Sequence, residues 1–111
     1  MTVTVSNIIL PKFAEASNAA QYTSDKVKTL IDKFTVTNVS ASSQTISIHI
    51  VNSGGSASDA NVVVKSKALF SGQTYSCPEL IGHVLEDGAF ISTIASATSA
   101  LSIRASGRVV S

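Results

Sequence analysis

The sequence contains few of the residues from which enzymes build reactive sites. Its 111 residues include one cysteine, two histidines and no tryptophan, and only 14% are charged. A single cysteine excludes a disulfide within the chain and a cluster of thiolate metal ligands drawn from it alone. Two isolated histidines do not make a converging set of ligands or a catalytic group. We therefore expect no metal, no cofactor and no enzymatic activity.

Charge of one sign and long hydrophobic runs are also missing. Eight Lys and Arg stand against seven Asp and Glu, so the chain lacks the basic surface that phosphate binding requires, and we expect no nucleic-acid partner. No apolar run exceeds three residues, whereas a helix that crosses a bilayer needs about 20. Polar residues interrupt the apolar ones before Lys12, the first lysine, which does not fit an export signal. We expect a soluble protein that is made in the cytoplasm and has no membrane partner.

The residues that are abundant favour β-strands. Val, Ile and Thr account for 32 of the 111 residues, and Ser and Thr together for 29. β-Branched side chains have a restricted χ1 angle and suit a pleated, half-buried surface better than a helix. A chain of this length buries one modest core, so we expect one β domain.

Alternation of apolar and polar residues, which is typical of a strand with one buried face, recurs along the chain. It is clearest at 44–51, where three isoleucines alternate with polar residues. A Ser-rich turn at 40–43 joins this segment to a strand at 30–39, and we expect the two to pair as an antiparallel hairpin. Further strands are expected at 62–70, 74–77, 89–95 and 101–105, with a helical turn at 79–85 and an exposed polar loop at 52–61.

The first ten residues begin as an extended, strand-like arm. Two valines alternate with polar residues, and three apolar residues follow, up to Pro11. Proline lacks the amide donor that the interior of a strand needs, so we expect a break there. The break separates an N-terminal arm or first strand, 1–11, from a β-sandwich domain, 12–111. The segment 12–20 fits a short helix or an irregular strand.

The spacing of these segments predicts the fold class. Seven or eight strands, separated by turn residues at intervals of about 8 to 15 residues, are typical of an antiparallel sandwich. We expect an all-β fold: a single antiparallel β-sandwich, jelly-roll-like, with the N-terminal arm and one short helical turn. Gly107, near the end, predicts a bulge or a close approach of two backbone segments.

Three residues with reactive side chains each have a plain structural interpretation. His49 falls on the polar face of 44–51, so we expect it to be exposed or at an interface. His83 lies in an apolar turn, and we expect it to be partly buried and hydrogen-bonded. Cys77 has no Cys-x-x-Cys companion, and we expect it to be a small buried hydrophobic residue.

Three stretches of the sequence resemble small virion proteins from the head genes of tailed bacteriophages. They are LIDKFTVTN at 30–38, TYSCPELIGHVL at 74–85 and LSIRASGR at 101–108. The chain is similar to the capsid decoration, or staple, protein of epsilon15-like short-tailed phages. This resemblance implies a jelly-roll-like β-sandwich that forms a homodimer on the outer surface of the virion, where it clamps neighbouring copies of the major capsid protein.

On this resemblance the expected function is structural: the protein stabilises the icosahedral shell against internal DNA pressure. An extended apolar arm can add to the sheet edge of a neighbour through backbone hydrogen bonds. An ordinary first strand inside the chain's own sandwich fits the same pattern equally well. The candidate capsid-contact residues are Thr2, Val3, Thr4, Val5, Ile8, Ile9 and Leu10.

Two other functions fit parts of the sequence. A β-sandwich binding module of a phage tail or fibre, recognising a host surface glycan, would use the polar loop at 52–61, although this loop has no aromatic residue on which a sugar would stack. A small enzyme of the cupin kind needs several histidines and a carboxylate around a metal. His49 and His83 alone do not supply that set.

Overall fold

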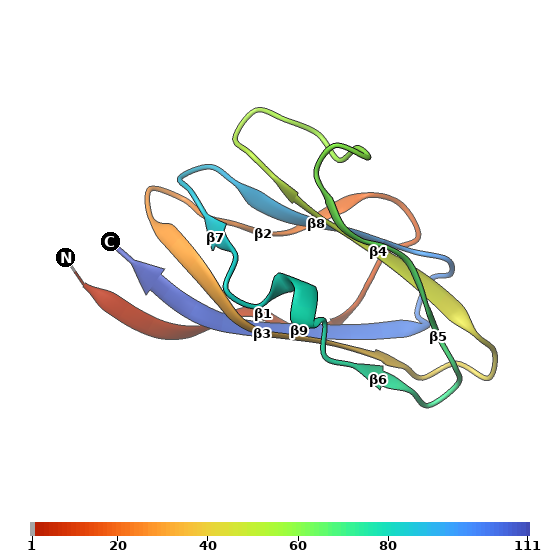
Figure 1. Ribbon diagram of the computed structural model, residues 1–111. Coiled ribbons are helices and arrows are strands. Elements are labelled where there is room, and N and C mark those ends of the chain that lie inside the picture. Colours follow the sequence, from red (N-terminus) through yellow and green to blue (C-terminus); the bar gives the residue numbers. More distant parts are fainter. Residues whose placement is uncertain (1) are drawn as a thin grey trace.

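The computed structural model describes residues 2–111, and nearly all of its regular structure is β-strand (Figure 1). Two antiparallel sheets pack against each other, which confirms the expected β-sandwich. In chain order the elements are β1 (Val3–Phe13), β2 (Ala19–Thr23), β3 (Lys28–Asn38), β4 (Gln44–Val51), β5 (Val62–Leu69), β6 (Thr74–Tyr75), the 3₁₀ helix η1 (Pro78–Leu80), β7 (Val84–Leu85), β8 (Phe90–Ala95) and β9 (Leu101–Val110).

When the short β7 is left out, the strands pair from the two ends of the chain inward: β1 with β9, β2 with β8, β3 with β6 and β4 with β5. Sheet A has the order β1-β9-β3-β6, with β7 also on β3, and sheet B has the order β2-β8-β4-β5. Each early strand therefore lies beside its late counterpart, as in a long hairpin that has been rolled into two sheets. This winding is that of a jelly roll, as the sequence predicted.

The expected hairpin between 30–39 and 44–51 is wrong. Both strands form where they were expected, as β3 and β4, but β3 belongs to sheet A and β4 to sheet B. An alternating strand buries one face whether its successor pairs beside it or faces it across a core. The pattern therefore does not distinguish a hairpin from an arch between sheets.

Asn38, the last residue of β3, holds this arch in place. Its side chain is fully buried. The amide nitrogen donates to the carbonyl oxygens of Ser42 (2.8 Å) and Leu69 (3.0 Å). The amide oxygen accepts from the backbone N–H (2.9 Å) and the hydroxyl (2.7 Å) of Ser40. Because Leu69 ends β5, one amide connects the end of sheet A, the turn and sheet B.

We expect Asn38→Ala to lower the free energy of unfolding by about 2–4 kcal/mol, since buried backbone groups in the arch lose their partner. Urea unfolding followed by circular dichroism measures this change. Asn61→Ala is the matched control, because the Asn61 amide bonds only within an exposed loop. An equal loss in the two variants would show that the Asn38 amide does not hold the arch.

The core lies between the sheets and consists of their inward-facing side chains. Phe34 is completely buried, whereas Phe90 is only partly buried. The largest fully buried side chains come from both sheets and from η1: Phe34, Ile31, Ile46, Ile48, Leu69, Leu80, Leu85, Ile91, Leu101, Ile103, Val36 and Val51.

The helical turn is shorter than the apolar spacing indicated. Only Pro78–Leu80 is helical, and the chain then joins sheet A as β7. The N–H of Gly82 donates to the carbonyl of Ile31 (2.9 Å), and the N–H of Ile31 donates to the carbonyl of His83 (3.0 Å). Pairing with β3 therefore replaces further helical turns.

Within residues 2–111 no helix is long and apolar enough to cross a membrane.

β1 continues through Pro11, so the expected break at this residue is wrong. Proline is tolerated because β1 is the outer strand of sheet A, where one row of backbone groups needs no partner within the sheet. The register with β9 shifts between Ser6 and Ile9 and again between Ile9 and Lys12. Such bulges bend an edge strand and increase its twist.

The segment 12–20, which fits either a short helix or an irregular strand by sequence, contains the end of β1, the loop and the start of β2.

Gly107 lies where β9 passes very close to β3. A Cβ atom at this position would collide with the carbonyl oxygen of Leu30, which confirms the expected close approach of two backbone segments. The register of β3 with β9 shifts at the same place, between Ile31 and Lys33. Glycine thus gives these two neighbouring strands of sheet A the room to stay paired.

We expect Gly107→Ala to lower the free energy of unfolding by about 1–3 kcal/mol, because the new methyl group forces β9 and β3 apart. Ser102→Ala, on the same strand, is the control and should change stability by no more than about 0.5 kcal/mol. Urea unfolding compares the two variants. If Gly107→Ala is as stable as the control, the close approach does not constrain sheet A.

Candidate functional site

The exposures of the two histidines differ from those expected. His49 was expected to be exposed or at an interface, and at 7% exposure it is not exposed. β4 is an inner strand of sheet B, and Ser92 and Val62 flank His49 on the neighbouring strands. His83 is exposed, so the expectation of a partly buried residue is wrong. Within residues 2–111 no three His, Cys, Asp or Glu side chains gather closely enough to hold a metal ion.

Cys77 is fully buried beside η1, as expected. Burial, and secondarily the negative charge of Glu79, raises the pKa of the Cys77 thiol to about 12. The thiolate is the nucleophilic form of cysteine, so at neutral pH this residue is a hydrophobic side chain. Tyr75 donates a hydrogen bond to Glu79, and the pKa of the tyrosine is raised to about 12 by burial and by this bond.

We expect the protein to lose stability as pH rises from about 9 toward 12. The Cys77 thiol ionises near pH 9 in the unfolded chain but only near pH 12 in the folded one, so rising pH favours the unfolded state by at most about 1.4 kcal/mol per pH unit. Tyr75 acts in the same direction. Urea unfolding at several pH values should show a shallower decline for Cys77→Ala than for the native chain. Parallel declines would contradict the raised thiol pKa.

The candidate arm residues divide into a buried and an exposed group. Ile8 and Ile9 are 8% and 3% exposed and belong to the core of the sandwich. They face inward together because the first register shift of β1 lies at this point. In contrast, Val3, Val5 and Leu10 are 53%, 79% and 69% exposed, and the candidate residues Thr2 and Thr4 are exposed as well. Contact of the arm with a capsid stays a prediction.

β1 is a long and unprotected sheet edge. It has 11 residues, forms the outer strand of sheet A, and carries no charged side chain before Lys12. An edge strand presents a row of free N–H and C=O groups, and proteins usually shield such an edge by charge, proline, short length or β-bulges. Here proline and lysine stand only near the end of the strand, and the register shifts lie between Ser6 and Lys12. Residues 3–6 pair regularly with β9, and their free edge is suited to pairing with a strand of another chain.

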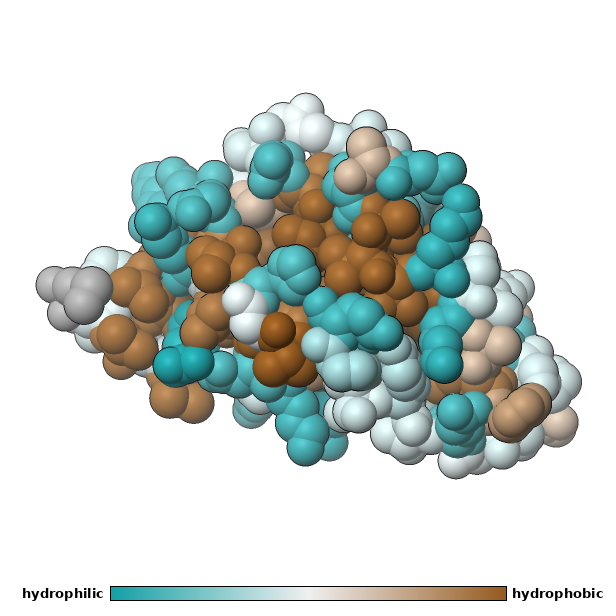
Figure 2. Space-filling model, in the orientation of Figure 1, coloured by the Kyte–Doolittle hydropathy of each residue, from teal (hydrophilic) through white to brown (hydrophobic). Residues whose placement is uncertain are grey.

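The outer face of sheet A continues this apolar surface beyond β1. Val5 pairs with Arg108 of β9, Arg108 with Leu30 of β3, and Leu30 with Val84 of β7. Directly opposed residues share a face, so this row crosses four strands. Figure 2 shows brown, apolar side chains at the surface near the grey N-terminus. The apolar members of this surface, here called the apolar end of sheet A, are Val3, Val5, Leu30, Val84 and Val110.

The sequence interpretation missed three members of the apolar end. The sequence pattern places Val84 in the helical turn at 79–85, ends the last strand at 105, before Val110, and gives Leu30 the same parity as the buried Phe34 and Val36. The sequence does carry a signal for Val110, because Arg104, Arg108 and Val110 keep a period of two up to the end of β9. The pairing of 84–85 with β3 has no comparable signal.

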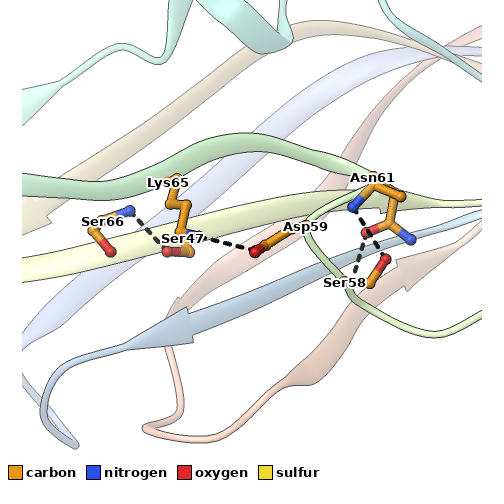
Figure 3. A network of polar contacts seen from close by, with 7 residues as sticks. Ser47, Ser58, Asp59, Asn61, Lys65 and Ser66 are labelled. Atoms are coloured by element: carbon orange, nitrogen blue, oxygen red, sulfur yellow. Dashed lines mark hydrogen bonds and ion pairs between the residues drawn. The ribbon is translucent and has the colours of Figure 1, made fainter.

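The polar loop at 52–61 is exposed, as expected. Figure 3 shows that its polar groups bind one another. Asn61 accepts a hydrogen bond from the N–H of Ser58 (3.0 Å), and Asp59 pairs with Lys65 (3.0 Å). The Asn61 amide also donates to the carbonyl of Ser56 (2.8 Å). The side chains of Asn61 and Asp59 are thus engaged by other groups of this chain.

No protein-family model matches the sequence, and no curated protein matches it. Solved structures nevertheless share its fold. A chain of Bacillus endospore appendages, described as a novel family of disulfide-linked pili, aligns with a TM-score of 0.55 at 12% identity, over 99% of this chain and 88% of its own. A chain of the infectious bursal disease virus Gx strain aligns with a TM-score of 0.52 at 13% identity, over 97% of this chain and 32% of its own. At these identities the likeness establishes the β fold alone.

Proposed function

We propose that this chain is a capsid decoration protein of a bacteriophage head. It binds the outer surface of the icosahedral shell as a homodimer and clamps neighbouring major capsid protein subunits, which stabilises the shell against internal DNA pressure. The proposal involves no catalysis, no cofactor, no nucleic acid and no membrane. The observation that carries it is the free edge of β1, which is long, uncharged over most of its length and apolar at Val3, Val5 and Leu10.

The fold supports an assembly role without identifying the partner. One structural neighbour comes from a virus and the other from pili described as disulfide-linked. We propose no disulfide between copies of this chain, because the single cysteine of the chain, Cys77, is 0% exposed. We therefore propose a noncovalent contact with the shell, for which a sheet edge is suited.

Strand addition provides a physical mechanism for the clamp. Backbone hydrogen bonds along β1 supply affinity, and alternate side chains such as Val3 and Val5 supply specificity by filling pockets on the neighbour. Binding that favours the assembled shell over free subunits stabilises the shell by mass action. A homodimer engages two subunits at once, so its second contact forms at a high effective concentration.

We expect Val5→Asp to abolish attachment to shells while leaving the fold intact. The side chain is 79% exposed, so the free energy of unfolding should change by no more than about 0.5 kcal/mol. In a docked interface the same carboxylate would be buried, and the opposing Arg108 is already bound to Asp32, so burial costs about 3–5 kcal/mol. Co-sedimentation with phage shells that lack this protein measures attachment.

Val39→Asp is the matched control, since Val39 is 57% exposed and lies outside β1. Equal attachment of the two variants would remove β1 from the mechanism. A native chain that does not attach to shells of its own phage would contradict the proposed function itself. Point substitution is preferable to deletion of residues 2–10, because deletion also removes Ile8 and Ile9 from the core.

A further inference from the structure

A hollow of about 370 Å³ lies on the outer face of sheet A, next to the apolar end. Its walls come from β1, β9 and β3, and the two register shifts of β1 fall beside it. A bulged edge strand bends away from a flat sheet, which accounts for a depression at this point. The polar side chains that line it are Asn7, Lys33, Thr35, Arg104 and Ser106.

Two positive charges share this hollow. Lys33 pairs with Ser106, and Thr35 pairs with Arg104, so Lys33 and Arg104 are diagonal neighbours on one face of two adjacent strands. Diagonal neighbours stand about 7–8 Å apart, within reach of long side chains. Like charges at this spacing repel each other, and an anion between them would relieve that repulsion.

The chain itself supplies no acid to this pair. None of the residues lining the hollow is acidic. Within residues 2–111 the four ion pairs involve Lys12, Lys28, Lys65 and Arg108, so neither Lys33 nor Arg104 forms an ion pair. Asp32 adjoins Lys33 in sequence, but Arg108 holds its carboxylate with two guanidinium nitrogens at 2.9–3.2 Å.

The neutral groups of the hollow are also unengaged. In the described part of the chain, the side chains of Asn7, Thr35 and Ser106 make no hydrogen bond to another protein group. An amide and two hydroxyls can all donate to an oxyanion. The hollow therefore combines two cations, three neutral donors and no competing acceptor charge.

We propose that this hollow is an anion site that receives a carboxylate of a neighbouring protein chain, held by Lys33 and Arg104. The inference rests on the proposed function, because the neighbour is the subunit that docks along β1. Asn7, Ile9 and Pro11 of β1 line the hollow, so a chain that docks along β1 lies beside it. An arginine can hold such a carboxylate through two parallel hydrogen bonds.

A carboxylate in this site would also set the register of docking. The backbone groups of β1 repeat every two residues, so strand addition alone leaves several registers available, and few charged side chains along β1 distinguish them. Only a register that brings an Asp or Glu over Lys33 and Arg104 satisfies both cations. The hollow thus contributes specificity, and the apolar edge contributes affinity.

The test uses an acetylated, amidated tetraglutamate peptide and, separately, inorganic phosphate, titrated into the isotope-labelled native chain and followed by NMR. The peptide should give saturable shifts at residues 33, 35, 104 and 106. Lys33→Gln and Arg104→Gln should each weaken its binding about fivefold, the size of one exposed ion pair. Lys26→Gln is the matched control, because Lys26 forms no ion pair in residues 2–111 and lies outside the hollow.

Shifts that do not saturate, or an equal loss in Lys26→Gln, would overturn the site. Binding of phosphate without binding of the peptide would show a free anion site and overturn the protein carboxylate as its ligand.

Shell attachment separates this inference from the proposed function. If a Lys33→Gln and Arg104→Gln double variant attaches to shells as well as the native chain, with the same salt dependence, the hollow is not a docking site although the decoration function stands. If the native chain attaches to no shell, that function fails, and the peptide titration still decides whether the hollow binds carboxylates.

Discussion

Sheet A depends on the pairing of β9 with β1 on one side and β3 on the other. β9 is the last strand of the chain, and both its neighbours come from the first half. Gly107 makes the close approach to β3 possible, and Thr2 and Ser111 exchange two backbone hydrogen bonds of 2.9 Å at the open end of the pair with β1. Because β1 has no other neighbour in its sheet, its free edge exists only once the end of the chain has folded against it. The proposed binding surface is therefore a product of the complete fold.

The individual strands follow from local sequence, whereas their assignment to sheets does not. The isoleucine alternation at 44–51 predicts β4 to the residue, because one half-buried face is a property of the strand itself. The hairpin was wrong because β3 and β4 bury their inner faces in the same core from opposite sheets. The buried Asn38 amide, with its bonds to Ser42 and Leu69, connects the two sheets across the arch. Those partners lie up to 31 positions away in sequence, beyond any local pattern.

The candidate surface was predictable in part for the same reason. The valines of β1 and their hydroxyl neighbours indicate a strand with two unlike faces, but they do not show whether that strand is inside a sheet or at its edge. The pattern also treats Ile8, Ile9 and Leu10 as one apolar group. The structure buries the first two and exposes Leu10 to 69%, because a bulge, which has no compositional signature, changes which side chains face inward. Lys33 and Arg104 are 71 positions apart, and only the register of β3 with β9 brings them together.

The bulges of β1 also bear on how an unprotected edge avoids unwanted pairing. A long, flat, uncharged edge promotes aggregation through strand addition, and β1 has the length and the composition for it. Its two register shifts interrupt the regular row of backbone groups, and the cations of the adjacent hollow disfavour any strand that brings another positive charge over them. A partner must match the bend and carry a negative charge at one position. The same irregularity that makes β1 a poor template for arbitrary strands therefore makes it a selective site for one.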